Sequence, residues 1–119
     1  MKDQPLISVI IPVYNAAHYL KQCIAAIRTS SYPSYEIIVV NDASTDDSAE
    51  TARKHGAMVL ELPSQSGPAA ARNYGAKKAK GDILLFIDSD VLVKKETLAV
   101  VAKDFVKNPD LDTGYFVFL

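Results

Sequence analysis

Two carboxylates one residue apart, Asp88 and Asp90, carry the most evident chemistry in this sequence. They follow the apolar run Ile83 to Ile87, which has the character of a strand buried on both faces. Carboxylates this close repel each other unless a proton or a cation intervenes. Oxygen ligands of this kind suit Mg²⁺ or Mn²⁺, which complete their shells with water and substrate phosphates. Asp is also a favoured turn and helix-cap residue, so the pair taken alone leaves a plain turn equally open.

Other polar side chains follow two further apolar runs. Tyr14 follows the first run, and its ring can stack on a base or simply pack against the protein. Asp42 follows the second, where its carboxylate can accept a hydrogen bond from a nucleobase imide or form an Asx-turn. Asn15 by itself is an ordinary helix N-cap. Arg72 can pair with phosphate or with Asp42, although a solvated helix face is the default for a lone arginine.

Apolar runs alternate along the chain with segments of helical character. The predicted strands are Leu6 to Val13, Glu36 to Val40, Met58 to Leu62 and Ile83 to Ile87, with Tyr115 to Leu119 as a possible fifth. Helices are expected between them, including a small-residue helix that begins at Pro68. This alternation predicts an α/β fold with a parallel sheet and helices on both faces. Ligands bind such sheets beyond the carboxyl ends of the strands, where the polar residues above would converge.

Composition narrows the classes of function. A chain of 119 residues suits one domain, and a net charge of −1 argues against a protein that mainly coats nucleic acid. The single Cys23 excludes an internal disulfide and favours a reducing, cytoplasmic compartment. No apolar run approaches the ~18 to 20 residues of a membrane-spanning helix. The sequence therefore predicts a globular domain for a small-molecule ligand, with no transmembrane segment and no nucleic-acid partner.

Four segments together resemble the nucleotide-sugar half of family 2 glycosyltransferases, which have the Rossmann-like GT-A fold. They are SVIIPVYN (residues 8–15), EIIVVNDASTDDS (36–48), GPAAARNYGAKKAKGD (67–82) and LLFIDSDV (84–91). The resemblance covers roughly residues 6 to 108, and four motifs in the right order are far more specific than any one. With the strand–helix alternation, it implies a sheet of order 3-2-1-4. It also implies metal-dependent transfer of a sugar, with inversion, from a nucleoside diphosphate sugar, most simply a UDP-sugar.

The resemblance also assigns roles to individual residues. Asp42 would contact the base, and Asp90 would bind the divalent cation. Asp88 would lie nearer the ribose and sugar and would be a second ligand of the cation. The implied substrate-binding residues are Pro12, Tyr14, Asn15, Asp42, Arg72, Asp88 and Ser89. The acceptor would be a sugar or a lipid-linked glycan, as in polysaccharide biosynthesis, in the cytoplasm or at the cytoplasmic face of a membrane.

One feature of the family is not found in these residues. Its members have a second half that binds the acceptor and supplies the carboxylate general base. We therefore expect residues 1–119 to be a single nucleotide-sugar-binding domain, a truncated catalytic domain without turnover of its own. The alternative to a glycosyltransferase is a non-enzyme, namely a nucleotide-sugar-binding fragment or module without turnover of its own. A phosphatase of the haloacid dehalogenase type also uses an Asp-x-Asp pair, but after its first strand and with Thr or Val where Leu92 stands.

The C-terminal residues predict a further property. Tyr115 to Leu119 carry no charge and would form the edge of the sheet. Exposed apolar edges recruit other chains, because their backbone groups and apolar area are both left open. Self-association through this edge is therefore expected.

Overall fold

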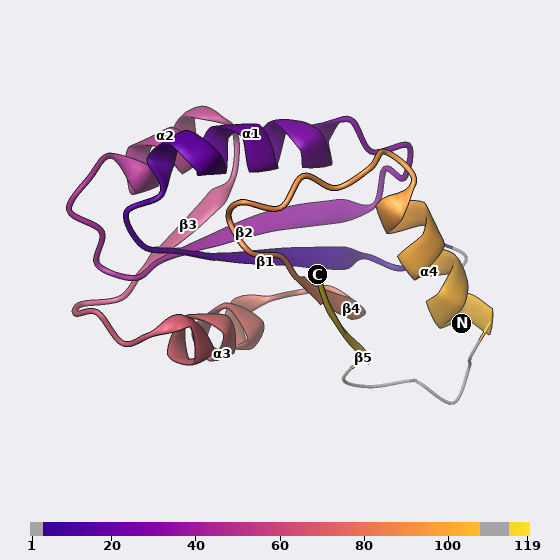
Figure 1. Ribbon diagram of the computed structural model, residues 1–119. Helices are drawn as coiled ribbons and strands as arrows, with labels where there is room; N and C mark the ends of the chain where they lie inside the picture. Colours follow the sequence, from indigo (N-terminus) through magenta and orange to yellow (C-terminus); the bar gives the residue numbers. More distant parts are fainter. Residues whose placement is uncertain (1–3, 108–114) are drawn as a thin grey trace.

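Strands and helices alternate along the whole chain in a computed structural model that describes residues 4–107 and 115–119. The elements are β1 (Ile7–Val13), α1 (Ala17–Arg28), β2 (Tyr35–Asn41), α2 (Ser48–Lys54), β3 (Met58–Glu61), α3 (Pro68–Lys78), β4 (Ile83–Phe86), α4 (Thr97–Lys107) and β5 (Tyr115–Phe118). Figure 1 shows the strands side by side in one sheet. The predicted α/β alternation, with its fifth strand, is confirmed.

The sheet has the order β3-β2-β1-β4-β5, and each of its four pairings is parallel. The predicted order 3-2-1-4 is therefore confirmed, with β5 added beside β4. In the central strand, Ile10 lies opposite Ile38 of β2 and Phe86 of β4. Because β1 has β2 on one side and β4 on the other, the loops that follow these three strands emerge next to one another.

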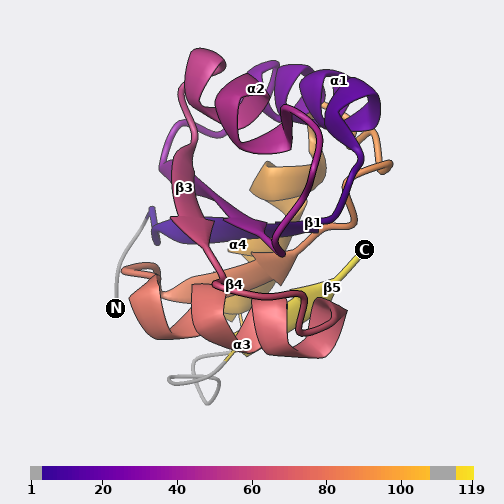
Figure 2. The same ribbon diagram turned by 90° about the vertical axis from the view of Figure 1, so that its left-hand side faces the viewer.

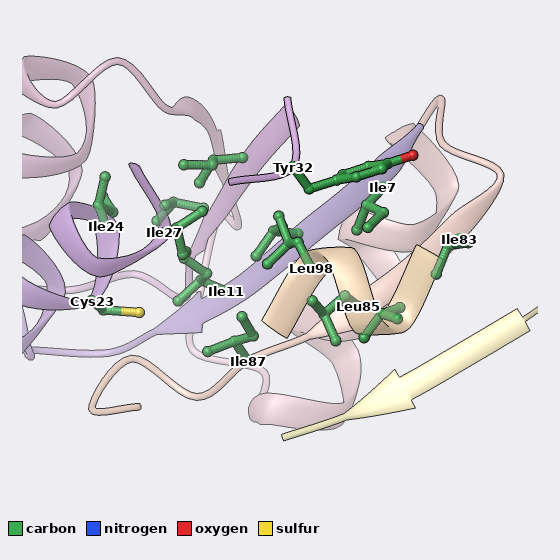
Figure 3. Close-up of a cluster of buried hydrophobic side chains, with 14 of the residues drawn as sticks. Ile7, Ile11, Cys23, Ile24, Ile27, Tyr32, Ile83, Leu85, Ile87 and Leu98 are labelled. Carbon is green, nitrogen blue, oxygen red and sulfur yellow. The ribbon is translucent and has the colours of Figure 1, made fainter. Parts of the chain in front are cut away.

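Helices cover both faces of the sheet, as predicted. On one face, α1, α2 and α4 pack on the alternate β1 residues Ile7, Val9 and Ile11. On the other face, α3 packs on a smaller cluster that includes Ile10 and Val40. Figure 2 shows α3 on the side of the sheet opposite α1 and α2, and Figure 3 shows the larger cluster, in which Cys23 and Leu98 lie among the isoleucines. The alternation of side chains along β1 therefore supplies both cores.

The small residues of α3 let it lie close to the sheet. A Cβ atom added at Gly75 would lie 2.7 Å from Cγ2 of Ile10 and 3.0 Å from Cγ2 of Val40. Ala71, one turn earlier on the same helix, is fully buried. None of the helices in the described part of the chain has both the length and the apolar character that crossing a membrane requires.

Candidate functional site

A pocket of about 270 Å³ lies at the carboxyl ends of the central strands. Its walls come from the loops after β1, β2 and β4 and from the start of α3. The lining residues are Pro12, Val13, Tyr14, Asp42, Gln65, Pro68, Asp88 and Ser89. The volume lies just below the ~300–1,000 Å³ that is usual for ligand pockets. The structure thus brings together most of the residues that the sequence singled out, at the edge of the sheet where they were expected.

Asp42 is the buried acid of this pocket, with 4% of its surface exposed. Its two carboxylate oxygens accept hydrogen bonds from the backbone N–H groups of Ser66, at 2.7 Å, and Gly67, at 2.9 Å. Its own backbone N–H donates to the carbonyl of Val13, at 2.8 Å. The local side-chain-to-backbone bond in this loop is made by Asn41, whose Oδ1 accepts from the N–H of Ser44 three residues on. Asp42 therefore joins the ends of β1 and β2 to the loop before α3.

Tyr14 stands at the rim of the pocket with 45% of its surface exposed. The free ring face is the kind of surface on which a planar ligand stacks.

Asn15 does not cap α1, so the expectation of an ordinary N-cap was wrong. The N-cap residue is Ala16, which makes no side-chain hydrogen bond to the helix. Asn15 has a φ of 50°, and its Oδ1 accepts from the backbone N–H groups of Thr45, at 2.7 Å, and Asp46, at 3.2 Å. Asn15 thus links the loop after β1 to the loop after β2, which is a positional role beside the pocket.

Asp46 performs the capping that Asn15 does not. Its carboxylate accepts from the backbone N–H of Ala17, in the first turn of α1, at 3.2 Å, and from the backbone N–H of Ser48, at 2.9 Å. Burial favours the neutral acid, but the hydrogen bonds from Ser48 and Ala17 outweigh it, and the pKa of Asp46 is lowered. A charged Asp46 at neutral pH therefore holds the two loops together.

Asp88 and Asp90 lie on a tight turn, in which the backbone N–H of Val91 donates to the carbonyl of Asp88 at 3.0 Å. The turn does not cap a helix, because α4 begins only at Thr97. Arg72 reaches across from α3, and its Nη2 lies 3.8 Å from Oδ1 of Asp88. The carboxylate beyond β4 is thus one partner of Arg72.

The carboxylate pair has a donor set that fits an open cation site. Among the residues that the structure describes, no three His, Cys, Asp or Glu side chains gather closely enough to enclose a metal ion. Asp88 and Asp90 are both exposed at the edge of the pocket. Two exposed carboxylates suit Mg²⁺ or Mn²⁺, which keep several ligands from water or phosphate. They do not suit a closed structural site.

Cys23 is part of the core, on the α1 side of the Asp88–Val91 turn. Its Sγ lies 3.8 Å from the carbonyl oxygen of Asp88. Burial, together with the negative charge of Asp90, raises the pKa of this thiol to about 12. The thiol therefore stays protonated at neutral pH and offers no nucleophile to the site.

The structure also separates some predicted residues and adds others. Asn15, Arg72 and Asp90 flank the pocket without lining it. Val13, Gln65 and Pro68 line it, although their residue types gave no chemical signal. Gln65 lies in a loop of ordinary turn residues, and only its place at the carboxyl end of the neighbouring strand could have pointed to it.

The fold and the site define an α/β domain with a pocket at the carboxyl ends of its parallel strands, and comparison with known proteins identifies its family. The family model of glycosyl transferase family 2 matches residues 8–117. A glycosyltransferase of Haemophilus influenzae, itself uncharacterized, is 42% identical over an alignment of 101 residues. The alignment covers 81% of this chain and 40% of the relative. The chain belongs to glycosyl transferase family 2, and it spans less than half the length of this relative.

Solved structures agree with this assignment. The mannosyltransferase PcManGT of Pyrobaculum calidifontis, in complex with GDP-Man and Mn²⁺, is 30% identical with a TM-score of 0.81, over 86% of this chain and 32% of its own. Staphylococcus aureus TarS 1-349, in complex with UDP-GlcNAc, is 33% identical with a TM-score of 0.79, over 87% of this chain and 32% of its own. The resemblance read from the four motifs, and the Rossmann-like GT-A fold, are thereby confirmed.

Proposed function

We propose that this chain is the nucleotide-sugar-binding domain of a glycosyltransferase that takes its sugar from a nucleoside diphosphate sugar, most simply a UDP-sugar. The observation that carries the proposal is the convergence in one pocket of an exposed aromatic ring, a buried acid and an exposed carboxylate turn. Tyr14 and Asp42 lie on the β1 and β2 side, and Asp88 lies on the β4 side. A ligand with a planar base at one end and a charged diphosphate at the other matches this division.

Each part of the site has a task in this proposal. Tyr14 and Pro12 form the wall for the base, and Asp42 is the acid at its floor. Arg72, held beside Asp88, places a positive charge near the diphosphate. Asp90, with Asp88, would hold Mg²⁺ or Mn²⁺. When bound, the cation supplies positive charge that stabilises the departing diphosphate. Ser89 and Asn15 complete the set, Ser89 at the wall of the pocket and Asn15 by fixing the loop beside it.

Transfer with inversion needs one group beyond these. The bond between the anomeric carbon and the diphosphate oxygen breaks while the acceptor oxygen attacks from the opposite face. A general base must take the acceptor proton. We place that base, and the binding site for a sugar or lipid-linked acceptor, outside residues 1–119. The single, free and buried Cys23 of this chain fits a reducing, cytoplasmic setting.

Titration calorimetry with UDP tests the proposal. We expect UDP to bind about tenfold or more tightly with Mn²⁺ than with EDTA, because a cation relieves the repulsion between Asp88, Asp90 and the diphosphate. Asp90→Ala should lose most of this metal dependence. Lys77→Ala, which changes an exposed charge near the far end of α3, serves as the matched control and should bind as the unaltered chain does.

Equal affinity in Mn²⁺ and EDTA, or an Asp90→Ala variant that keeps the metal effect, would refute the cation site. Absence of UDP binding under all conditions would refute the nucleotide site as a whole.

Binding without turnover is the second candidate function. It is favoured by the short span of the chain, which covers 40% of the Haemophilus influenzae relative. Hydrolysis or transfer of a UDP-sugar, assayed with Mn²⁺ against a panel of acceptors, separates turnover by these residues from binding alone. Release of UDP above the rate without protein would show that residues 1–119 perform the reaction themselves.

A further inference from the structure

The carboxylate of Asp42 has a set of partners that its sequence motif does not predict. Both oxygens are occupied by backbone N–H groups of the β3–α3 loop (residues 63–67), one from Ser66 and one from Gly67. These partners lie 24 and 25 residues further along the chain. Hydrogen bonds to a charged acceptor are about twice as strong as neutral ones, and burial strengthens them further. The contact therefore joins two distant segments firmly.

The loop that Asp42 holds forms one wall of the pocket. Gln65 lines the pocket immediately before the two bonded amides, and Pro68 lines it immediately after them. Within residues 63–67 the structure shows one hydrogen bond from a side chain, and it is local, from Ser66 Oγ to the carbonyl of Ser64 at 2.9 Å. Because the side chains of Gln65 and Ser66 are exposed, packing does little to fix their position. The carboxylate of Asp42 is thus the long-range side-chain contact that restrains this wall, between backbone bonds at Leu62 and Ala71.

We propose that Asp42 is a positioning residue of the nucleotide pocket. Its carboxylate holds the β3–α3 loop against the end of β2. Gln65 and Pro68 are thereby kept in place as a second wall of the nucleotide pocket. This inference rests on the proposed function, since it assumes that the pocket takes a nucleotide. It adds that a large part of the contribution of Asp42 to affinity acts through the loop, in addition to any direct contact with the base.

The proposal distinguishes two ways in which a change at Asp42 weakens binding. If Asp42 acts only by touching the base, removing a loop N–H donor leaves nucleotide affinity unchanged. If Asp42 acts through the loop, removing the donor weakens binding in the same way as removing the acceptor. Ser66→Pro deletes the donor, because proline has no N–H, and leaves the carboxylate intact. Ser66→Ala keeps the N–H and is the matched control.

A double-mutant cycle on UDP affinity with Mn²⁺, measured by calorimetry, provides the main test. We expect Asp42→Asn and Ser66→Pro each to weaken UDP binding by about tenfold, the range of one hydrogen bond to a charged group. Ser66→Ala should bind within about twofold of the unaltered chain. The double variant should be little weaker than Asp42→Asn alone, because both changes break the same contact. Ser66→Pro with unaltered affinity, or fully additive losses, would overturn the proposal.

Backbone amide exchange supplies a second measurement that requires neither proline nor nucleotide. In the free chain, Asp42→Asn should speed hydrogen exchange of the Ser66 and Gly67 amides by tenfold or more, while amides of β1 keep their rates. Unchanged exchange at both loop amides would overturn the proposal even where Ser66→Pro does not fold. Failure of the unaltered chain to bind UDP would instead refute the proposed function, and the exchange result would still report on the loop.

Discussion

Two residues next to the lining of the candidate site have a strained backbone. Among the described residues other than glycine, Asn15 and Ala43 have positive φ angles, 50° and 58°. Asparagine tolerates this left-handed region, and Asn15 gains hydrogen bonds there from Thr45 and Asp46. Ala43 has no side-chain group to offset the strain. Such strain persists where surrounding contacts determine the backbone, here the bonds that hold Asp42 on one side and Ser44 on the other.

Ala43→Gly should therefore stabilise the protein. Glycine adopts the left-handed region without a Cβ clash, and the relief exceeds the extra entropy of glycine in the unfolded chain. We expect the free energy of unfolding to rise by about 0.5–1 kcal/mol, measured by urea denaturation. Ala49→Gly makes the same chemical change inside α2 and should lower it by about 1 kcal/mol. A destabilised Ala43→Gly variant would contradict the strain at this position.

Helix α3 is the element that carries one side of the site, and it is held at both ends. At its start, the carboxylate of Asp42 holds the residues that precede Pro68. Beyond its end, the buried hydroxyl of Ser8 accepts from the N–H of Gly81 at 2.8 Å, and Glu36 accepts from the N–H of Lys80 at 2.9 Å. Between these points Gly75 brings the helix against Ile10 and Val40. Arg72 therefore faces Asp88 from a firmly placed helix.

Gly75→Ala should weaken this packing. The added methyl group would need Ile10 and Val40 to move, and both are β-branched and fully buried. Overpacking of a core costs about 1–3 kcal/mol, which exceeds the ~1 kcal/mol that alanine gains over glycine in helix propensity. The net effect is a fall in the free energy of unfolding of up to about 2 kcal/mol, measured by urea denaturation.

The exposed position Asn73 on the same helix gives the control. Asn73→Ala improves helix propensity without touching the sheet and should be neutral or slightly stabilising. A Gly75→Ala variant as stable as Asn73→Ala would show that α3 packs less tightly against the sheet than the structure indicates.

At the scale of the whole molecule, the two edges of the sheet are β3 and β5. β5 pairs with β4 on one side, in a register that places Tyr115 opposite Ile83. On its other side, β5 has no neighbouring strand in this sheet. Residues 115–119 carry no charge, and charged residues are a common protection of such edges. The self-association expected from the sequence therefore stays a prediction. The strand order locates the expected contact at the outer side of β5.

Light scattering at micromolar concentration tests this prediction. We expect residues 1–119 to show a mass above that of the 12.9 kDa monomer, increasing with concentration. A shorter chain that ends at Asp110 lacks β5 and leaves β4 as the edge, so its mass and solubility should differ from those of the full chain. A strictly monomeric chain, with unchanged mass and solubility on shortening, would show that the edge does not recruit a second copy.

Much of this protein was determined by its sequence alone. The apolar runs are local patterns of period two or of continuous burial, and they predicted the strands and their parallel pairing. β1 through β4 also took the order expected from the alternation and the family motifs. Because parallel strands end at one edge, the sequence also predicted that Tyr14, Asp42 and Asp88 would converge.

Only the tertiary structure decided what these residues touch. Asn15 and Asp42 stand in motifs that suggest a cap and a ligand contact, yet each bonds to a loop more than 20 residues away. Gln65 entered the pocket through such a loop. Hydrogen bonds of this kind form between segments that have no common periodicity, and a polar residue has several partners of similar energy. Which partner is within reach depends on how the sheet places the loops, so the choice is made by the fold and not by the local sequence.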